Sequence, residues 1–335
     1  MKNLIDVSMK LQTEDQCLDF IEKVRWPDGF IRCVRCGNDK VSRITRTVNP
    51  SVTRKERKQN KRTRLYACLE PTCKHRFTPT VGTLFHDSHL PLTKWFAAVA
   101  LIVHAKKGMS AKQVERHLGV NYRTAWYMGH RIRKAMASGE GILSPKSDPN
   151  DGGPTVRAIK PRKLSGTVEV DETYIGGKHR GYKGMYDNKE VVMGIRERGG
   201  DLRLIHITDN SSASLAEQIT KHVDDKVKMV VTDEWSAYPA AMIASGIHGS
   251  RHETIRHKDG VYVDGIVHTN TVESAFSLFK RGVVGSFHKV SGKHLHRYLS
   301  EFEYRFNRRK DANLFEDAVG QMVSTAEMKY RDLVS

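Results

Sequence analysis

The sequence predicts a protein of mixed α+β and α/β class, in which a cysteine-containing segment and a helical segment precede a domain built on a mixed β-sheet. Two cysteine pairs lie within residues 33–73, apolar residues recur at helical spacing within 92–137, and short strands begin near Gly166. We therefore expect an N-terminal helix and cysteine-containing domain over 1–82 and a helical domain over 83–137. A linker rich in Ser, Pro, Gly and Asp should cover 138–165, and the sheet domain with C-terminal helices 166–335.

The charge balance indicates a polyanionic partner. The 335 residues include 56 Lys and Arg against 38 Asp and Glu, a formal net charge of +18. Such an excess favours binding to nucleic acid through its phosphates, and a membrane surface is the competing interpretation. No apolar run approaches the ~20 residues of a spanning helix, and the N-terminus does not resemble a signal peptide, so we expect no membrane partner.

The cysteine spacing predicts one structural zinc site. Cys33 and Cys36 are separated by two residues, and Cys68 and Cys73 by four, so each pair can direct two thiolates to one tetrahedral ion. The alternatives are four unrelated buried thiols, or His75 in place of one sulfur. Between the pairs, residues 43–64 contain nine Lys or Arg and one Glu, which is typical of a solvated loop or hairpin arm.

The segment before the first cysteine pair reads as a short amphipathic helix over 13–24. Cys17 has no partner in the sequence pattern. Its apolar helical neighbours predict a core thiol.

Residues 110–136 carry the pattern of a helix-turn-helix. Ser110 and Asn121 suit the starts of two helices separated by a turn at Gly119 and Val120. The second helix should bury Ala125, Met128 and Ile132 and leave outside the side chains expected to bind DNA: Arg123, Tyr127, His130, Arg131 and Lys134. An ordinary three-helix bundle with a solvated basic face is the alternative.

The C-terminal half has the element order of an RNase H-like mixed sheet. We expect strands at 167–175, 190–196, 202–208 and 227–232, with a weak strand near 253–257. Helices should cover 212–224, 236–245, 269–281 and 293–309.

Three acids in this half suggest metal-dependent phosphoryl chemistry. Asp171 lies in a strand whose alternation puts it on one face with Glu169. Asp233 lies at the end of an apolar strand, and Glu273 at the start of a helix. Carboxylates from two strands and a helix can hold two Mg²⁺ ions, which stabilise the attacking and leaving oxygens of an in-line displacement. Lys280, two helical turns after Glu273, would meet a DNA phosphate.

Neighbouring acids leave alternatives open. A lone acid at a strand end is usually only solvated, and Glu169, Glu172 and Glu234 are near enough in sequence to replace one of the three.

With these motifs, the sequence resembles bacterial insertion-sequence transposases of the DDE type with an N-terminal zinc ribbon. The resemblance is carried by four segments: VEVDETYIGGK ending at Lys178, TDEWSAY around Asp233, HTNTVE ending at Glu273 and followed by Phe279-Lys280-Arg281, and the basic aromatic helix from His294 to Arg309. The spacings of 62 and 40 residues between the acids also resemble that family, and the match covers nearly the whole chain.

The resemblance implies a DNA transposase that binds the terminal inverted repeats of its element, frees a 3′-hydroxyl and joins it to target DNA. Asp171, Asp233 and Glu273 would hold two Mg²⁺ or Mn²⁺ ions. Because some relatives have Asn at the third position, Asn270 is the second candidate there. Arg281 would contact DNA, and Arg305 and Arg308 would either contact phosphates or brace the core. The resemblance also implies a homo-oligomer on paired ends, acting in the bacterial cytoplasm at the nucleoid.

Three other functions fit parts of the sequence. A non-catalytic regulator would need only the zinc ribbon and helix-turn-helix. An RNase H-like nuclease would cut DNA without joining strands, and a decayed copy would still fold. The full set of acids in the expected order favours the transposase.

Overall fold

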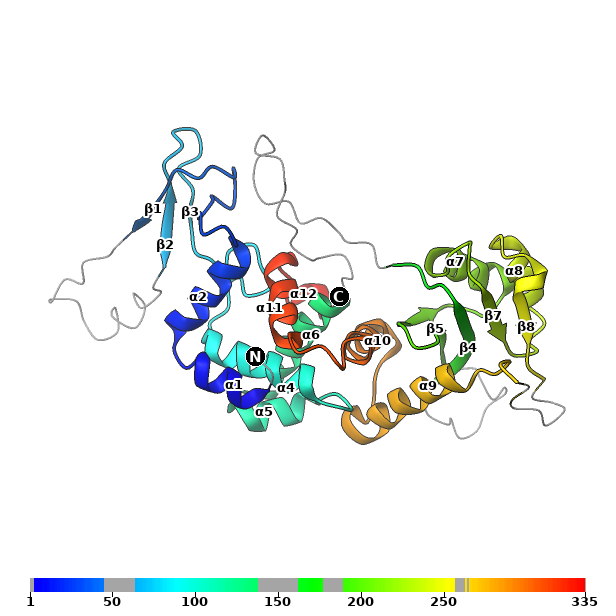
Figure 1. Ribbon diagram of the computed structural model, residues 1–335. Helices are drawn as coiled ribbons and strands as arrows, with labels where there is room; N and C mark the ends of the chain where they lie inside the picture. Colours follow the sequence, from blue (N-terminus) through cyan, green and yellow to red (C-terminus); the bar gives the residue numbers. More distant parts are fainter. Residues whose placement is uncertain are drawn as a thin grey trace. The chain divides into compact units, whose positions relative to one another are not determined.

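The computed structural model describes residues 3–44, 64–137, 162–176, 189–256, 263 and 265–334, which form two compact units (Figure 1). Among these residues, the N-terminal unit takes 3–104, 111–137 and 311–334, and the sheet unit takes 105–110 and 162–310. The expected domains 1–82 and 83–137 thus belong to one unit. Residues 311–334, which we expected in the sheet domain, join that unit as well.

The zinc-ribbon segment of the N-terminal unit is a three-stranded antiparallel sheet in the order β1-β2-β3, formed by Val41–Ile44, Leu65–Cys68 and Arg76–Phe77. Trp26, Tyr66 and Phe77 pack together beside the cysteines. Residues 45–63 of the predicted basic arm lie outside the described residues. Arg64, at the arm's end, is buried against Glu22 at 2.8 Å.

The other regular elements described in the N-terminal unit are helices. They are α1 Leu4–Lys10, α2 Glu14–Arg25, α4 Leu92–His104, α5 Ala111–Leu118, α6 Tyr122–Ala137, α11 Leu314–Ser324 and α12 Arg331–Val334. The predicted helix at 13–24 is confirmed as α2, whose N-cap Thr13 forms a capping box with Gln16. Phe96 of α4 packs against Phe315 of α11, which explains why α11 completes this core. Sequence periodicity had not indicated α1, α11 or α12.

The sheet unit contains a five-stranded mixed sheet with the order β6-β5-β4-β7-β8. Its strands are β4 Thr167–Ile175, β5 Glu190–Glu197, β6 Leu202–Ile207, β7 Met229–Thr232 and β8 His252–Thr254. The first three are antiparallel neighbours, and β7 and β8 continue the sheet in parallel. This topology confirms the predicted RNase H-like fold. Residues 138–161 of the expected linker are not described, and its end at Leu164 is buried and bridges to Val223.

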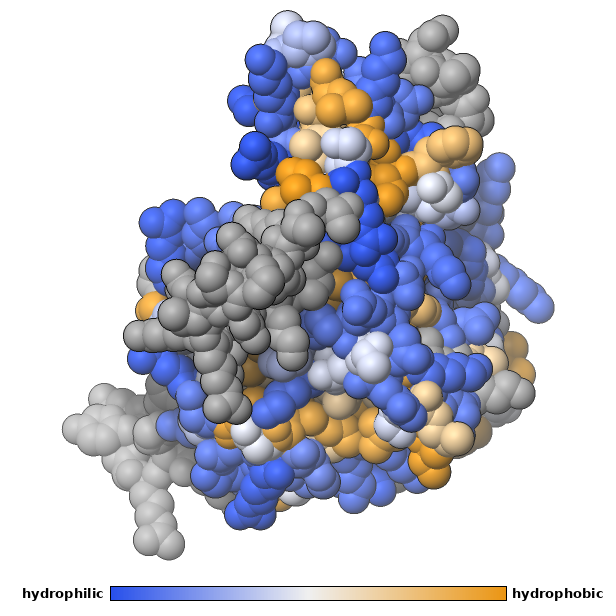
Figure 2. Space-filling view, turned by 90° about the vertical axis from the view of Figure 1, so that its left-hand side faces the viewer, coloured by the Kyte–Doolittle hydropathy of each residue, from blue (hydrophilic) through white to orange (hydrophobic). Residues whose placement is uncertain are grey.

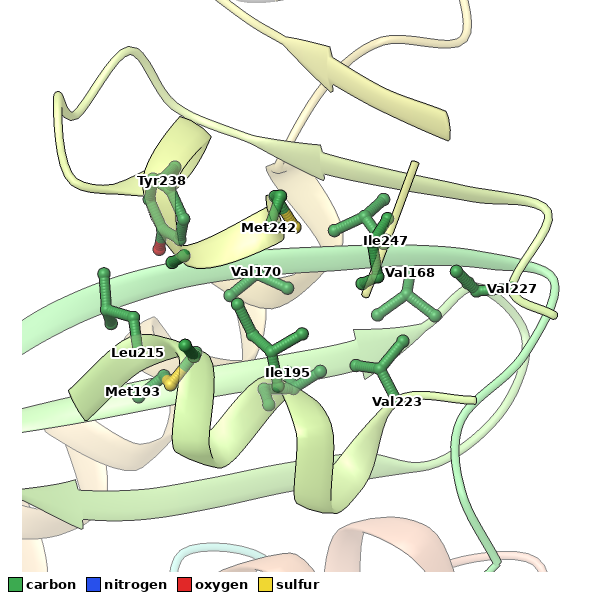
Figure 3. Close-up of a cluster of buried hydrophobic side chains, with 14 of the residues drawn as sticks. Val168, Val170, Met193, Ile195, Leu215, Val223, Val227, Tyr238, Met242 and Ile247 are labelled. Carbon is green, nitrogen blue, oxygen red and sulfur yellow. The ribbon is translucent and has the colours of Figure 1, made fainter. Parts of the chain in front are cut away.

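Helices cover both faces of this sheet. On one face, α7 Ser212–His222 and α8 Tyr238–Ala244 pack on a core that includes Val170, Ile195 and Leu215 (Figure 3). On the other face, α9 Asn270–Gly282 and α10 Gly292–Asn307 pack through Val272, Phe276 and Leu299. Because strand side chains alternate between faces, a residue's position in β4 decides which pair of helices it meets.

The face seen in Figure 2 is mostly hydrophilic. In the view of Figure 2, hydrophilic residues surround smaller hydrophobic groups. None of the helices in the described parts of the chain is long and apolar enough to cross a membrane.

Candidate active site and cysteine cluster

Asp171 lies within β4, and Asp233 directly follows the neighbouring parallel strand β7. The parallel register pairs Glu169 of β4 with Val231 of β7, and each aspartate comes two residues later in the chain. Strands in parallel register keep equivalent side chains on the same face. Asp171 and Asp233 therefore come side by side where β7 ends.

Helix α9 covers the face of the sheet on which Asp171 lies. Asp171 is paired across the antiparallel ladder with Gly194, so the two share a face. A Cβ atom at Gly194 would lie 2.5 Å from the Phe276 ring and 2.7 Å from Val272, both on α9. Glu273, in the first turn of the same helix, is thereby brought to the aspartates, and its Oε1 accepts a hydrogen bond from the Thr269 hydroxyl at 2.6 Å.

The electrostatics of Asp171 show that the other two acids lie close enough to act on it. Burial, followed by the negative charges of Asp233 and Glu273, raises the pKa of Asp171 to about 7. The Glu172 backbone N–H, which donates to Asp171 Oδ1 at 2.8 Å, and the positive charge of Lys280 oppose this rise. A carboxyl group in this state gains most from a nearby cation.

The other residues predicted around the acids lie on α9. Asn270 is exposed as its first residue, and Glu273, in the same turn, acts on Asp171 through its negative charge. Lys280 and Arg281 lie in its last turn on the exposed side of the helix, and partial burial of the Lys280 ammonium group lowers its pKa.

The neighbouring acids occupy different environments. Glu172 lies on the opposite face of β4 from Asp171, next to the buried ring of Tyr238, and burial raises its pKa to about 8. Glu234 is half-buried beside Asp233. Glu169 shares the face of Asp171, but its side chain is fully buried and already accepts hydrogen bonds from the start of α9.

The four cysteines meet in one cluster. Their sulfur atoms all lie within 4.8 Å of one another, with 3.8 Å between Cys33 and Cys73 and 3.6 Å between Cys36 and Cys68. Tetrahedral zinc with Zn–S bonds of ~2.3 Å places sulfurs ~3.8 Å apart, so this donor set fits one zinc ion. His75 is outside the cluster and stacks on Phe77. Cys17 is fully buried, as predicted, and burial raises its pKa to about 12.

Comparison with known proteins agrees with this architecture. Residues 163–307 match the ISXO2-like transposase domain, and residues 12–76 match the transposase zinc-ribbon domain. The chain therefore carries an ISXO2-like transposase domain preceded by a transposase zinc ribbon. The family predicted from the sequence is thereby confirmed.

Two individual proteins are similar to this transposase over most of its length. An uncharacterised protein in transposable element ISH50 of Halobacterium salinarum is 25% identical over 310 residues, which cover 88% of this chain and 90% of the relative. The crystal structure of the Mos1 strand transfer complex matches with a TM-score of 0.29 and 10% identity, over 68% of this chain and 74% of that one.

The DNA contacts predicted on helix α6 require a correction. Asn121 caps α6 as predicted, since its Oδ1 accepts the Thr124 N–H at 2.8 Å. The face of α6 expected to meet DNA, however, is covered by residues 326–330. His130 and Arg131 are buried, and the Arg131 guanidinium donates to the carbonyls of Leu84 at 2.9 Å and Met328 at 3.0 Å. Neither side chain is available for reading bases.

The remaining predicted DNA contacts on α6 differ in accessibility. The Tyr127 hydroxyl donates to the Met328 carbonyl, and Lys134 Nζ donates to the Ala326 carbonyl at 3.1 Å. Arg123 stays exposed at the start of the helix, with its guanidinium 4.4 Å from the centre of the Tyr330 ring.

Arg305 of the transposase braces the core, one of the two roles that the sequence left open. Its side chain is buried in α10, pairs with Glu301 at 3.1 Å and donates to the Ala105 carbonyl at 2.7 Å. Arg308 is half-buried over the Tyr304 ring.

Sequence reasoning missed two features near the acids. Trp235 is 45% exposed beside Asp233, and its indole N–H donates to the Asn210 carbonyl at 3.3 Å. The second is the set of hydrogen bonds to Glu169. The alternation in β4 predicts the face on which Glu169 lies. Hydrophobic periodicity, however, indicates neither that Trp235 is exposed nor that the start of α9 contacts Glu169.

Proposed function

We propose that this transposase cuts phosphodiester bonds at the ends of its element in a metal-dependent reaction and joins the freed 3′-hydroxyl to target DNA. The observation that supports it most is the placement of Asp171 and Asp233 at neighbouring strands, under the helix that carries Glu273. Three acids from two strands and a helix, concentrated in a strongly basic chain, are suited to phosphoryl transfer.

Asp171, Asp233 and Glu273 would hold two Mg²⁺ or Mn²⁺ ions. The fit rests on the chemistry of the donors, because hard cations prefer carboxylate oxygens and would relieve the repulsion that raises the pKa of Asp171. When bound, the ions would supply an activated nucleophile and stabilise charge on the phosphate. Glu273 is preferred to Asn270 as the third ligand because its charge reaches Asp171.

Residues of the chain itself would hold the DNA around this centre. Lys280 is close enough to Asp171 to affect its pKa and would pair with a phosphate next to the reacting one. Arg281 follows it on the same exposed end of α9 and would contact the strand beyond. The exposed ring of Trp235, held by its indole hydrogen bond, offers a surface on which a base can stack.

The N-terminal unit would recognise the terminal inverted repeats. The cysteine cluster would hold one structural zinc ion, which stabilises the ribbon. At the start of α6, Tyr122 is 52% exposed and Arg123 is exposed, and these first-turn positions are the ones that enter the major groove in helix-turn-helix proteins. We further propose that the active form is a homo-oligomer on paired ends, working at the nucleoid in the cytoplasm.

The test is cleavage of labelled DNA that carries the inverted repeats flanking the gene. With Mg²⁺, the wild-type protein should nick the repeat end and yield a joined product with a target duplex. Asp233→Asn should lower cleavage by at least about a thousandfold, because the metal site loses a charged ligand. Its binding to the same DNA should stay within about twofold. Retained cleavage in this variant would contradict the proposal.

The same assay separates the alternatives. Binding without cleavage by the wild-type protein would indicate a regulator or a decayed copy. Cleavage without a joined product would indicate an RNase H-like nuclease.

A further inference from the structure

Glu169 is a fully buried acid located two residues before Asp171 on the same face of β4. Burying a carboxylate is costly unless each oxygen receives hydrogen bonds or an opposite charge. Glu169 meets this requirement on both oxygens. Its partners are the first turn of α9, His268 just before that helix, and Arg198.

One oxygen of Glu169 caps the start of α9. Its Oε2 accepts the backbone N–H groups of Thr271 at 2.9 Å and Val272 at 3.0 Å, and the Thr271 hydroxyl at 2.7 Å. First-turn N–H groups have no partner within their helix and carry the positive end of its dipole. The strand that bears Asp171 is therefore bonded directly to the first turn of the helix that bears Glu273.

The other oxygen fixes the approach to the helix. Glu169 Oε1 accepts from Arg198 Nε at 2.7 Å and lies 3.3 Å from His268 Nδ1. The same guanidinium donates to the carbonyls of His268 at 2.8 Å and Ile266 at 2.6 Å. Glu169 and Arg198 together hold both the first turn of α9 and the residues just before it.

We propose that Glu169 is a positioning residue for the metal site, which sets the start of α9 so that Glu273 faces Asp171 and Asp233. The inference rests on the proposed function. Glu169 does not itself serve as a ligand, because its oxygens are engaged by the helix start and by Arg198. A residue that orients ligands in this way typically changes metal affinity tenfold to a hundredfold when it is altered.

The experiment is a Mn²⁺ titration of the zinc-loaded, full-length protein, followed by the electron paramagnetic resonance of free Mn²⁺. Glu169→Gln keeps the size of the side chain but removes the charge that holds Arg198 and the α9 amides. We expect its Mn²⁺ affinity to fall at least about tenfold. Thr271→Val removes only one hydroxyl donor to Glu169 and should give a smaller fall in the same direction.

The matched control is Glu190→Gln. Glu190 of β5 also lies at a helix start, since a Cβ atom at Gly292 in α10 would meet its carboxylate, and it pairs with His206 at 2.7 Å. Helix α10 carries none of the three acids, so this variant should bind Mn²⁺ like the wild type.

The outcomes separate the inference from the function on which it rests. Wild-type Mn²⁺ affinity in both Glu169→Gln and Thr271→Val would overturn the role of Glu169. If Glu169→Gln does not fold, Thr271→Val decides alone. Asp233→Asn is titrated alongside. If it also keeps wild-type affinity, the acids do not hold the metal and the proposed function fails. If it loses affinity while the Glu169 and Thr271 variants keep theirs, only the positioning role is overturned.

Discussion

Asp171 lies where an ionised carboxylate is costly in the metal-free protein. Burial and two acidic neighbours raise its pKa from 3.8 to about 7, whereas the unfolded chain keeps the ordinary value. The native state therefore holds a proton that the unfolded state loses between about pH 4 and pH 7. Stability contributed by the protonated carboxyl is present at low pH and is lost as the pH rises through this window.

We predict that Asp171→Asn stabilises the metal-free protein above pH 7 while it abolishes cleavage. The amide stays neutral, so unfolding should cost at least about 1 kcal/mol more than in the wild type. For a unit of this size, this is about 2–4 °C in Tm. Thermal denaturation in EDTA-free, Mg²⁺-free buffer at pH 5 and pH 8 measures it. At pH 5 the gain should shrink, and an equal gain at both pH values would count against the assigned electrostatics.

At the scale of elements, the strands and helices of the sheet unit were predictable because their periodicities are regular. Alternation in β4 indicated that Glu169 and Asp171 share a face, and the structure agrees. The approach of α9 to that face was not predictable, because it depends on a residue without a side chain. Gly194 allows the helix to lie directly on β5 opposite Asp171. A lone glycine within a strand indicates a close approach but does not identify what approaches.

Gly194→Ala should therefore destabilise the sheet unit and displace α9. Its new methyl group would lie 2.5 Å from the Phe276 ring, and overpacking of this kind typically costs about 1–3 kcal/mol. Displacement of Glu273 should lower metal-dependent cleavage as well. Gly249→Ala is the control, since nothing lies within 4 Å of its Cβ position. Urea denaturation and the cleavage assay compare the two variants, and equal stabilities would show that α9 does not press on Gly194.

At the scale of the whole molecule, the features that the sequence did not predict depend on contacts between residues far apart in the chain. Helix α6 has the charge pattern of a recognition helix, yet residues 326–330 cover much of the face on which its cations lie. Periodicity within one helix cannot indicate that a segment some 200 residues later packs on it. The same reason explains why α11 completes the N-terminal core rather than that of the sheet unit.

Substitution of Arg131 tests whether residues 326–330 pack on α6, because this side chain links α6 to two other segments of the N-terminal unit. Its guanidinium donates from α6 to the carbonyls of Leu84, His86 and Met328 at 2.9–3.2 Å. Arg131→Ala leaves these buried carbonyls without their charged donor. It should cost at least about 2 kcal/mol of unfolding free energy, measured by urea denaturation.

Arg123→Ala is the matched change on the same helix. Arg123 is exposed, and loss of its contact with the Tyr330 ring should cost only about 0.5–1 kcal/mol. Its effect should instead appear as weaker binding to inverted-repeat DNA and a smaller salt dependence, measured by fluorescence anisotropy at several salt concentrations. The reverse pattern, with a stable Arg131→Ala protein that binds DNA weakly, would mean that residues 326–330 leave α6 when DNA binds. The basic face predicted from the sequence would then be the recognition surface after all.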